Sequence, residues 1–287
     1  MRRFDYSAPR SLDEAVALLG RFGANASLFA GGTDLLVEIK EQIRTPDHVI
    51  DLKRIAGLET LAFDAARGLE IGALVKVRDL ETSPAVQRHY RGLWQAAREL
   101  GSIQVRNRAT LAGNVCRASP SADTLPPLVA DGATVRMHGP AGAREVAVEA
   151  FFTGPGKTVL ARDEIVTGFV LPAPVPGSGK AYIKHGRRKA MELATVGVAV
   201  TLVRRGETLE DVRIVLGAVA PTPLRARAAE SLLEGRVPDA ARLDAAAAAA
   251  MAESRPISDV RASANYRRQM VGVLVRRAVT LALETAR

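Results

Sequence analysis

Two glycine-containing segments of the chain carry the residue types that bind a phosphate group. The first is the run A-G-G-T-D at residues 30–34, which follows an apolar stretch expected to form a strand. Glycines let a backbone approach a ligand closely, because no Cβ intervenes, and free backbone N–H groups attract an anion. Most glycine pairs at such a position are only turns. The run has neither the G-x-G-x-x-G spacing of a Rossmann loop nor the Gly-Lys of a Walker loop, so a nucleotide would have to bind in another way.

The second segment is R-N-R-A-T-L-A-G-N-V at residues 106–115, and it continues to S-P-S-A-D at residues 119–123. Its guanidinium, hydroxyl and amide groups suit a phosphate-bearing ligand, and Asp123 could accept a hydrogen bond from a ribose hydroxyl. The same composition is typical of a solvated loop, and composition alone favours that interpretation. We predict that residues 106–117 are not helical, because they are polar and contain a glycine.

Regular elements must position these two segments. One helix is expected to begin at Ser11, which forms a capping box with Glu14, and another to run from Thr33 towards Pro46 with Ile43 on its apolar face. The remaining patterns predict helices at residues 93–100, 124–130, 244–253 and 261–287, and strands at residues 27–30, 48–52, 69–73, 133–137, 181–185, 195–203 and 212–220. This order indicates an α+β protein with a boundary near residue 177, within the Pro- and Gly-rich stretch 172–179.

The composition excludes several classes of protein. The chain has 287 residues, of which 47% are hydrophobic and 25% charged, as in ordinary globular proteins. Its single cysteine, Cys116, excludes an intrachain disulfide, a Cys-rich zinc site and an iron–sulfur cluster held by this chain alone. Cys116 is expected to be a small apolar filler, although it could lie near a ligand of the second segment. The histidines show neither metal-ligand spacing nor an acid–base partner, so no metal site and no catalytic residue are expected.

The net charge of +9 makes nucleic-acid binding one candidate function. The basic residues are spread along the chain with acidic residues between them, and only 4% of residues are aromatic. We therefore predict no nucleic-acid partner, since the excess charge can equally serve a phosphate ligand or acidic partner subunits. No leader segment and no apolar run of membrane-spanning length are evident, so a cytoplasmic protein without a membrane span is expected.

Four segments together resemble one protein family. Two of them resemble the two flavin loops of the FAD-binding medium subunits of molybdenum hydroxylases. The first is A-G-G-T-D-L-L at residues 30–36, and the second is R-N-x-A-T-L-A-G-N-V at residues 106–115 with S-P-S-A-D at 119–123. These medium subunits are the flavoprotein subunits of the xanthine dehydrogenase and carbon monoxide dehydrogenase group. K-H-G-R-R-K-A-M-E-L-A-T-V at 184–196 resembles the family's segment near the flavin ring, and D-V-R-A-S-A-N-Y-R-R at 259–268 its C-terminal signature. The resemblance covers the whole chain.

The resemblance implies a fold and a division of the chain. Residues 1–176 would adopt the two-subdomain FAD-binding fold of the vanillyl-alcohol oxidase and p-cresol methylhydroxylase type, with subdomains of about 1–57 and 58–176. Residues 177–287 would form a small C-terminal sheet-and-helix domain. FAD would bind between the subdomains, with its pyrophosphate against the two glycine-containing loops.

The resemblance also implies which residues lie at the cofactor. Matching the family's motifs position by position gives Phe29, Ala30, Gly31, Gly32, Thr33, Asp34, Leu35, Thr110, Ala112, Gly113, Asn114, Asp123, Ile165, Val166 and Lys184. Without the resemblance, Lys184 reads equally well as a surface lysine. The basic run at residues 187–189 is either a solvated face or a loop beside the flavin ring that influences access of the electron acceptor.

Three departures from the family's pattern matter. Ala112 stands where the family has a second glycine, so a methyl group must find room there. The first loop reads G-G-T-D in place of the G-G-H-S of carbon monoxide dehydrogenases, which argues against carbon monoxide as the substrate. The missing histidine also removes a point of covalent attachment, so non-covalent FAD is expected. Finally, the chain lacks the cysteine-rich insertion that gives some relatives an additional cluster.

The function that the resemblance implies is electron transfer within a complex. A large subunit with the molybdenum cofactor would hydroxylate a small substrate, and a small subunit with [2Fe-2S] clusters would pass electrons to FAD in this chain. A soluble acceptor such as NAD, oxygen or a quinone would then receive them. The family implies a heterohexamer with two copies of each subunit. The alternative is a self-contained FAD-dependent oxidoreductase on the same fold, although its C-terminal part shows no catalytic residues of its own.

Overall fold

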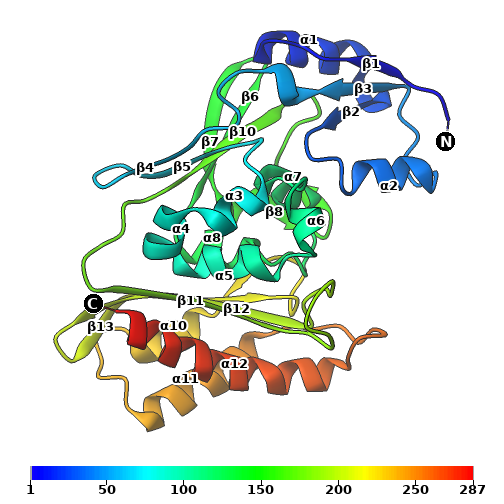
Figure 1. The fold of residues 1–287 in the computed structure, drawn as a ribbon. Helices are drawn as coiled ribbons and strands as arrows, with labels where there is room; N and C mark the ends of the chain where they lie inside the picture. The colour runs from blue at the N-terminus through cyan, green and yellow to red at the C-terminus, as the bar shows by residue number, and fades with distance from the viewer. Residues whose placement is uncertain (1, 287) are drawn as a thin grey trace.

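The computed structural model describes residues 2–286 and contains three main β-sheets with helices packed against them (Figure 1). Strands and helices are mixed up to about residue 171, and strands followed by helices make up the remainder. The predicted α+β class is therefore confirmed. Within residues 2–286, no helix is long and apolar enough to cross a membrane.

The first sheet is small and parallel. Its strand order is β1 (Asp5–Ser7), β3 (His48–Asp51) and β2 (Ala26–Phe29). The helix α1 (Leu12–Phe22) begins where Ser11 Oγ accepts a hydrogen bond from Glu14 N at 3.1 Å. The Glu14 carboxylate accepts from Arg10 N and not from Ser11 N, so the predicted capping box is only half formed.

The second sheet is antiparallel and occupies the middle of the molecule. Its strand order is β4 (Leu61–Asp64), β5 (Gly68–Gly72), β10 (Ile165–Leu171), β6 (Thr134–Gly139) and β7 (Gly142–Ala147). The helices inserted between β5 and β6 are α3 (Val77–Thr82), α4 (Pro84–His89), α5 (Arg91–Glu99), α6 (Ile103–Arg106), α7 (Leu111–Arg117) and α8 (Leu125–Ala130). After β7 come α9 (Val148–Phe151) and the hairpin of β8 (Phe152–Gly154) and β9 (Lys157–Thr158). The buried side chains of this sheet and its helices form one continuous core with α1.

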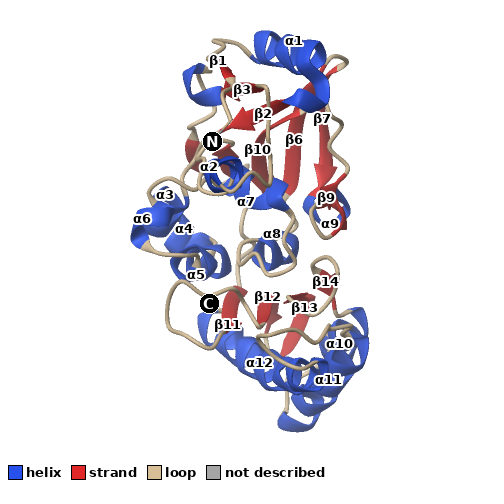
Figure 2. Cartoon of the chain, turned by 90° about the vertical axis from the view of Figure 1, so that its right-hand side faces the viewer, coloured by secondary structure: helices blue, strands red, loops and turns tan. Residues whose placement is uncertain are grey.

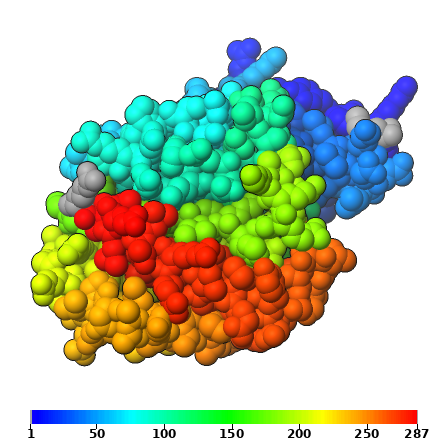
Figure 3. All heavy atoms as spheres, turned by 60° about the horizontal axis from the view of Figure 1, so that its bottom comes forward, coloured from blue at the N-terminus to red at the C-terminus, as the bar shows by residue number. Residues whose placement is uncertain are grey.

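The third sheet lies between two layers of helices. Its strand order is β11 (Ser178–His185), β12 (Val196–Arg205), β13 (Thr208–Gly217) and β14 (Leu224–Arg225), all antiparallel. The helices that follow are α10 (Arg227–Leu233), α11 (Ala240–Glu253) and α12 (Ala264–Thr285). These C-terminal helices cover one face, whereas α5 and α8 cover the other (Figure 2). Figure 3 shows the C-terminal residues, orange to red, gathered along one side of the molecule beside the cyan residues of its middle part.

The prediction that residues 106–117 are not helical is wrong. These residues include the end of α6 and the whole of α7. Thr110 starts α7 because its hydroxyl accepts a hydrogen bond from Gly113 N at 3.1 Å. Leu111 and Val115 are fully buried, and their spacing gives the short helix an apolar face that outweighs its polar composition.

The helix expected between Thr33 and Pro46 is shorter than predicted. It is α2 (Leu35–Lys40), and the chain leaves it through Gln42, whose φ of 60° lies in the left-handed region. Ile43 is consequently 75% exposed and not on the buried face. The last helix also starts later than predicted, at Ala264, because the Ser263 hydroxyl accepts from Tyr266 N at 3.2 Å and caps it.

A buried arginine ties the C-terminal helices to the loop before Asp123. Arg267 is only 2% exposed, and its Nη1 donates to the carbonyl oxygens of Thr195 and Ala218 at 2.8 and 3.1 Å. Its Nη2 donates to Asp259 Oδ1 at 2.7 Å. The backbone N–H of Ala218 in turn donates to the Pro120 carbonyl at 2.8 Å. Backbone N–H donation from Arg261, together with Arg267, lowers the pKa of Asp259 to about 2.

This lowered pKa predicts a pH-dependent stability. The ionised Asp259 stabilises the fold above its unfolded pKa of 3.8, and that stabilisation is lost as the pH falls towards 2. We expect Asp259→Asn to reduce the free energy of unfolding by about 2 kcal/mol at pH 7, because buried Arg267 loses a charged partner. The deficit should shrink as the pH falls from about 4 towards 2, and urea unfolding at a series of pH values would measure it.

Asp244→Asn is the matched control for this experiment. Asp244 pairs with Arg276 at 2.6 Å, but both side chains are more than half exposed. We expect its removal to change stability by less than about 0.5 kcal/mol. A deficit for Asp259→Asn that is the same at every pH would contradict a role for the carboxylate charge.

Candidate functional site

The two glycine-containing segments lie directly against each other in the structure. A Cβ added to Gly31 would fall 2.2 Å from the Arg108 carbonyl oxygen and 3.0 Å from Ala109 Cα. Both neighbours are backbone atoms and cannot rotate away, so no side chain fits at residue 31. The segments that the sequence singled out separately therefore form one continuous surface.

The first segment offers backbone donors that have no partner in the described part of the chain. No group among residues 2–286 accepts a hydrogen bond from the N–H of residues 31, 32, 33 or 34. Gly32 has a φ of 76°, and a Cβ there would fall 2.2 Å from the Phe29 ring. The tight backbone path thus exposes a row of free N–H groups, which is the donor set that a phosphate oxygen requires.

The second segment presents its open side in the first turn of α7. Gly113 is exposed, and a Cβ there would meet only the Thr110 hydroxyl, at 3.0 Å. Asn114 Oδ1 accepts a hydrogen bond from Thr124 Oγ1 at 2.6 Å, which leaves its amide group as a donor. Ala112 is 5% exposed, so its methyl group packs in the core and does not narrow the open side.

Arg117 joins the two segments a second time. At the end of α7, its Nη1 pairs with Glu38 of α2, and its Nε lies 3.8 Å from Asp34 Oδ2. Glu38 is 8% exposed, so one half of this contact is buried. The pair fixes the helix that follows the first segment against the helix that begins in the second.

Asp123 and Lys184 form a buried ion pair between the middle of the chain and the third sheet. Lys184 Nζ lies 2.8 Å from Asp123 Oδ2 and also donates to the Glu99 carbonyl at 3.0 Å. The two side chains are only 6% and 5% exposed. Burial raises the pKa of Asp123 to about 6, while the Lys184 ammonium acts in the opposite direction. Lys184 keeps one N–H that neither oxygen uses.

Besides Ala112, three of the residues implied by the resemblance have their side chains in the core. Ile165 and Val166 begin β10 and are 0% and 4% exposed. Leu35 is 9% exposed and packs with Ile39 and Val49. Phe29 lies closer to the open segments, with its ring against Gly32 and Lys53 Nζ 3.7 Å from the ring centroid.

Lys53 and Arg117 did not appear among the candidates from the sequence. Each has its contact with residues distant in the chain, and neither stands in a motif. Only the folded arrangement brings their charges to the first segment.

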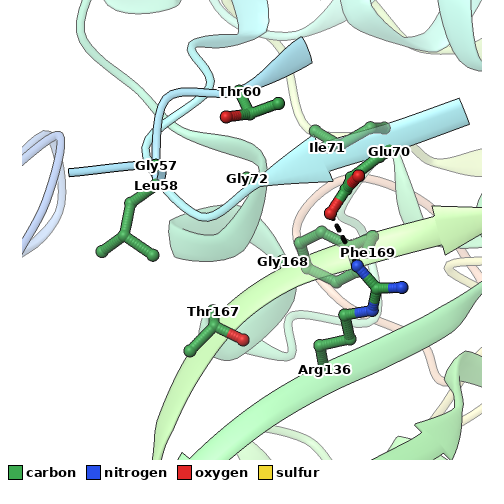
Figure 4. A pocket seen from close by; sticks show the side chains of 10 residues that line it. All are labelled: Gly57, Leu58, Thr60, Glu70, Ile71, Gly72, Arg136, Thr167, Gly168 and Phe169. Atoms are coloured by element: carbon green, nitrogen blue, oxygen red, sulfur yellow. Dashed lines mark hydrogen bonds and ion pairs between the residues drawn. The ribbon is translucent and has the colours of Figure 1, made fainter. Parts of the chain in front are cut away.

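Other features of the described residues do not compete with this site. A cavity of about 170 Å³ is lined by residues of the segment 57–60 and of β5, β6 and β10, and Arg136 pairs there with Glu70 at 2.6 Å. Figure 4 shows the residues that line it. Its lining includes none of the residues implied by the resemblance. Cys116 packs beside the core, and burial raises the pKa of its thiol to about 12, which matches a filler role. Residues 2–286 contain no cluster of three or more potential metal ligands.

Two family models match the chain. The FAD binding domain in molybdopterin dehydrogenase matches residues 2–174, and the CO dehydrogenase flavoprotein C-terminal domain matches residues 181–282. The chain belongs to this flavoprotein family. The resemblance that the four segments carry is thereby confirmed, as are the expectations that the chain is an oxidoreductase flavoprotein subunit and that its cofactor is FAD.

Individual relatives of this family align over nearly their full length. The chain is 39% identical to the carbon monoxide dehydrogenase medium chain of Hydrogenophaga pseudoflava, over 98% of this chain and 97% of that one. It is 30% identical to the xanthine dehydrogenase FAD-binding subunit of Escherichia coli O157:H7, over 98% and 96%. Among solved structures, carbon monoxide dehydrogenase from H. pseudoflava matches with a TM-score of 0.96 at 38% identity, covering 100% of this chain and 99% of that one. Quinoline 2-oxidoreductase from Pseudomonas putida 86 matches with a TM-score of 0.92 at 28% identity, over 99% and 98%.

The residues present fit the flavin cofactor of the family. FAD carries a pyrophosphate, whose oxygens require donors such as the free N–H groups of residues 31–34. The Gly31 contact holds these donors against the backbone of Arg108 and Ala109, just before α7 in the chain. The fit therefore depends on a glycine at residue 31.

Gly31→Ala should separate the two segments. The added methyl group cannot coexist with the Arg108 carbonyl, so the loops must move apart. We expect the dissociation constant for FAD to rise by about tenfold or more, because the donors no longer converge on one site. Flavin fluorescence titration of the purified chain would measure this, with thermal unfolding of the FAD-free protein recorded in parallel.

Gly20→Ala provides the control, since a Cβ at Gly20 meets nothing within 4 Å. We expect it to leave FAD affinity unchanged. Equal affinities for Gly31→Ala and Gly20→Ala would show that the contact between the loops plays no part in binding.

Proposed function

We propose that the chain is the FAD-binding electron-transfer subunit of a molybdenum-containing hydroxylase complex. In this role FAD accepts electrons from [2Fe-2S] clusters of a partner subunit and passes them to a soluble acceptor. The observation that carries the proposal is the joining of the two glycine-containing segments at Gly31, with free N–H donors along the first. Membership of the flavoprotein family supports the same assignment.

The proposed cofactor site uses the fifteen residues implied by the resemblance. Phe29 to Leu35 and the start of α7, from Thr110 to Asn114, would hold the pyrophosphate non-covalently. Asp123 and Lys184 would lie at the part of FAD that reaches the third sheet, and Ile165 and Val166 would support the site from the core. The division of the chain near residue 177, with subdomains of about 1–57 and 58–176, remains part of the same proposal.

The redox chemistry in this proposal belongs to the cofactor. When bound, FAD supplies the ability to take up and release electrons. The chain's own residues would bind and orient it: the N–H groups of residues 31–34 would donate to the pyrophosphate, and Lys184 and Asp123 would provide fixed charges.

The partners follow from what the chain lacks. A [2Fe-2S] cluster needs several thiolates, and this sequence has a single cysteine. We propose that a small subunit supplies the clusters and a large subunit the molybdenum cofactor, in a heterohexamer with two copies of each chain. The relatives' names support separate subunits, since they describe a medium chain and an FAD-binding subunit. A cytoplasmic location is part of this proposal and agrees with the near absence of cysteine.

The relatives' names do not select a substrate for this chain. They include carbon monoxide, xanthine and quinoline enzymes at comparable coverage. The G-G-T-D sequence of the first loop differs from the G-G-H-S that the resemblance assigns to carbon monoxide dehydrogenases. We propose that the molybdenum subunit determines the substrate.

The absorbance spectrum of the purified chain tests the proposal. We expect a flavin spectrum, and we expect acid to release FAD at about one molecule per chain, because no covalent attachment is proposed. Co-expression with the proposed molybdenum and iron–sulfur subunits should yield one complex that contains FAD, [2Fe-2S] clusters and the molybdenum cofactor. The chain alone should not turn over simple organic substrates, whereas such turnover would support a self-contained oxidoreductase instead. A chain that binds no FAD, both alone and in the complex, would rule out the proposal.

A further inference from the structure

Tyr182 makes a contact with Asp123 that neither the family motifs nor the family matches assign. Its hydroxyl donates to Asp123 Oδ1 at 2.8 Å, while Lys184 donates to Oδ2 at 2.8 Å. Tyr182 and Lys184 are two residues apart in β11, so their side chains lie on the same face of the strand. One strand of the third sheet thus holds both oxygens of the carboxylate.

The position of Tyr182 is itself fixed from three sides. Its backbone N–H donates to Gln95 Oε1 of α5 at 2.7 Å. Its ring lies over Gly197 of β12, where an added Cβ would fall 2.8 Å from the hydroxyl oxygen. The side chain is 4% exposed, and burial keeps the pKa of the hydroxyl well above its ordinary value, so the group acts as a donor.

Asp123 depends on these two donors for its orientation. It lies in the loop between α7 and α8, outside any regular element. Its side chain is almost fully buried, and its carboxylate accepts hydrogen bonds from Tyr182 and Lys184. Lys184 alone would hold one oxygen and leave the carboxylate free to rotate about its Cβ–Cγ bond, whereas the second donor fixes the plane.

We propose that Tyr182 is a positioning residue of the FAD site, which acts by orienting the Asp123 carboxylate and, through it, the Lys184 ammonium. This inference rests on the proposed function and adds a residue to its site. Each carboxylate oxygen keeps a further lone pair, and Lys184 keeps one unused N–H, so the oriented pair can still contact the cofactor. Loss of the Tyr182 hydroxyl would leave the buried Asp123 carboxylate with one hydrogen-bond donor fewer, and its plane would no longer be fixed.

Tyr182→Phe in the full-length chain tests the inference, because it removes the hydroxyl and keeps the ring. We expect the FAD dissociation constant to rise by about tenfold, the usual effect of losing one hydrogen bond to a charged group. We also expect a shift in the midpoint potential of the bound flavin, since the orientation of a nearby ion pair changes. Flavin fluorescence titration and spectroelectrochemistry at saturating FAD give these two values.

Tyr90→Phe is the matched control. The Tyr90 hydroxyl is also buried and donates to the Pro172 carbonyl at 2.8 Å, but it contacts none of the residues proposed to hold FAD. We expect it to lower the melting temperature about as much as Tyr182→Phe and to leave both FAD affinity and midpoint potential unchanged.

Each outcome bears on the inference. Weaker FAD binding and a shifted potential for Tyr182→Phe alone support it. Unchanged values for Tyr182→Phe, or equal changes in both variants, overturn it and reduce Tyr182 to a packing residue. If the wild-type chain binds no FAD, the proposed function is overturned and this inference with it. The wild-type titration is done first, so this failure is distinguished from a failure of the inference alone.

Discussion

The backbone of Gly31 and the carbonyl of Arg108 lie so close together that only glycine can occupy residue 31. This contact joins two segments that are separated in the chain by the helices α2 to α6, and the arrangement of the two glycine-containing segments depends on it. It brings the first loop, whose N–H groups at residues 31–34 have no acceptor among residues 2–286, against the backbone that leads into α7. Arg117 reinforces the same junction through a buried acidic partner, Glu38.

A second constraint comes from burying charge where the third sheet meets the helices. Removing an aspartate and a lysine from water costs several kcal/mol per ion unless their remaining hydrogen-bonding groups are satisfied. Here Tyr182 and the Glu99 carbonyl satisfy part of them, and one N–H of Lys184 has neither as its partner. Arg267 similarly links Ala218, which contacts Pro120, to the C-terminal helices. The proposed site thus includes a residue of the third sheet, Lys184, whose partner Asp123 lies in the middle of the chain.

The sequence predicted the local features that depend on composition and periodicity. We could predict the glycine turns, the strands β11 to β13 and the α+β order from the sequence. Glycine, β-branched residues and apolar spacing each favour a particular backbone conformation without help from distant residues. The helical state of residues 111–117 was missed because a single cap at Thr110 and two buried side chains outweigh the polar composition. Ile43 was misplaced because the left-handed turn at Gln42 has no strong signal in a non-glycine residue.

The contacts that organise the site could not be predicted from the residues alone. Tyr182 and Asp123 are 59 residues apart, and Arg117 and Glu38 are 79 residues apart, so no periodic pattern relates them. The resemblance named Asp123 and Lys184 separately, and the structure adds that they form a pair with Tyr182 as its third member. Long-range pairing of this kind is a property of the folded chain and not of any local stretch.

The most direct test of the account is a crystal structure of the chain with FAD bound. The account predicts that the pyrophosphate oxygens lie within hydrogen-bond distance of the N–H groups of residues 31–34 and of the first turn of α7, with Gly31 still against the Arg108 carbonyl. It also predicts Lys184 paired with Asp123 beside the cofactor. A pyrophosphate bound elsewhere, such as in the cavity lined by Arg136 and Glu70, would contradict the central claim that the two joined segments bind the cofactor.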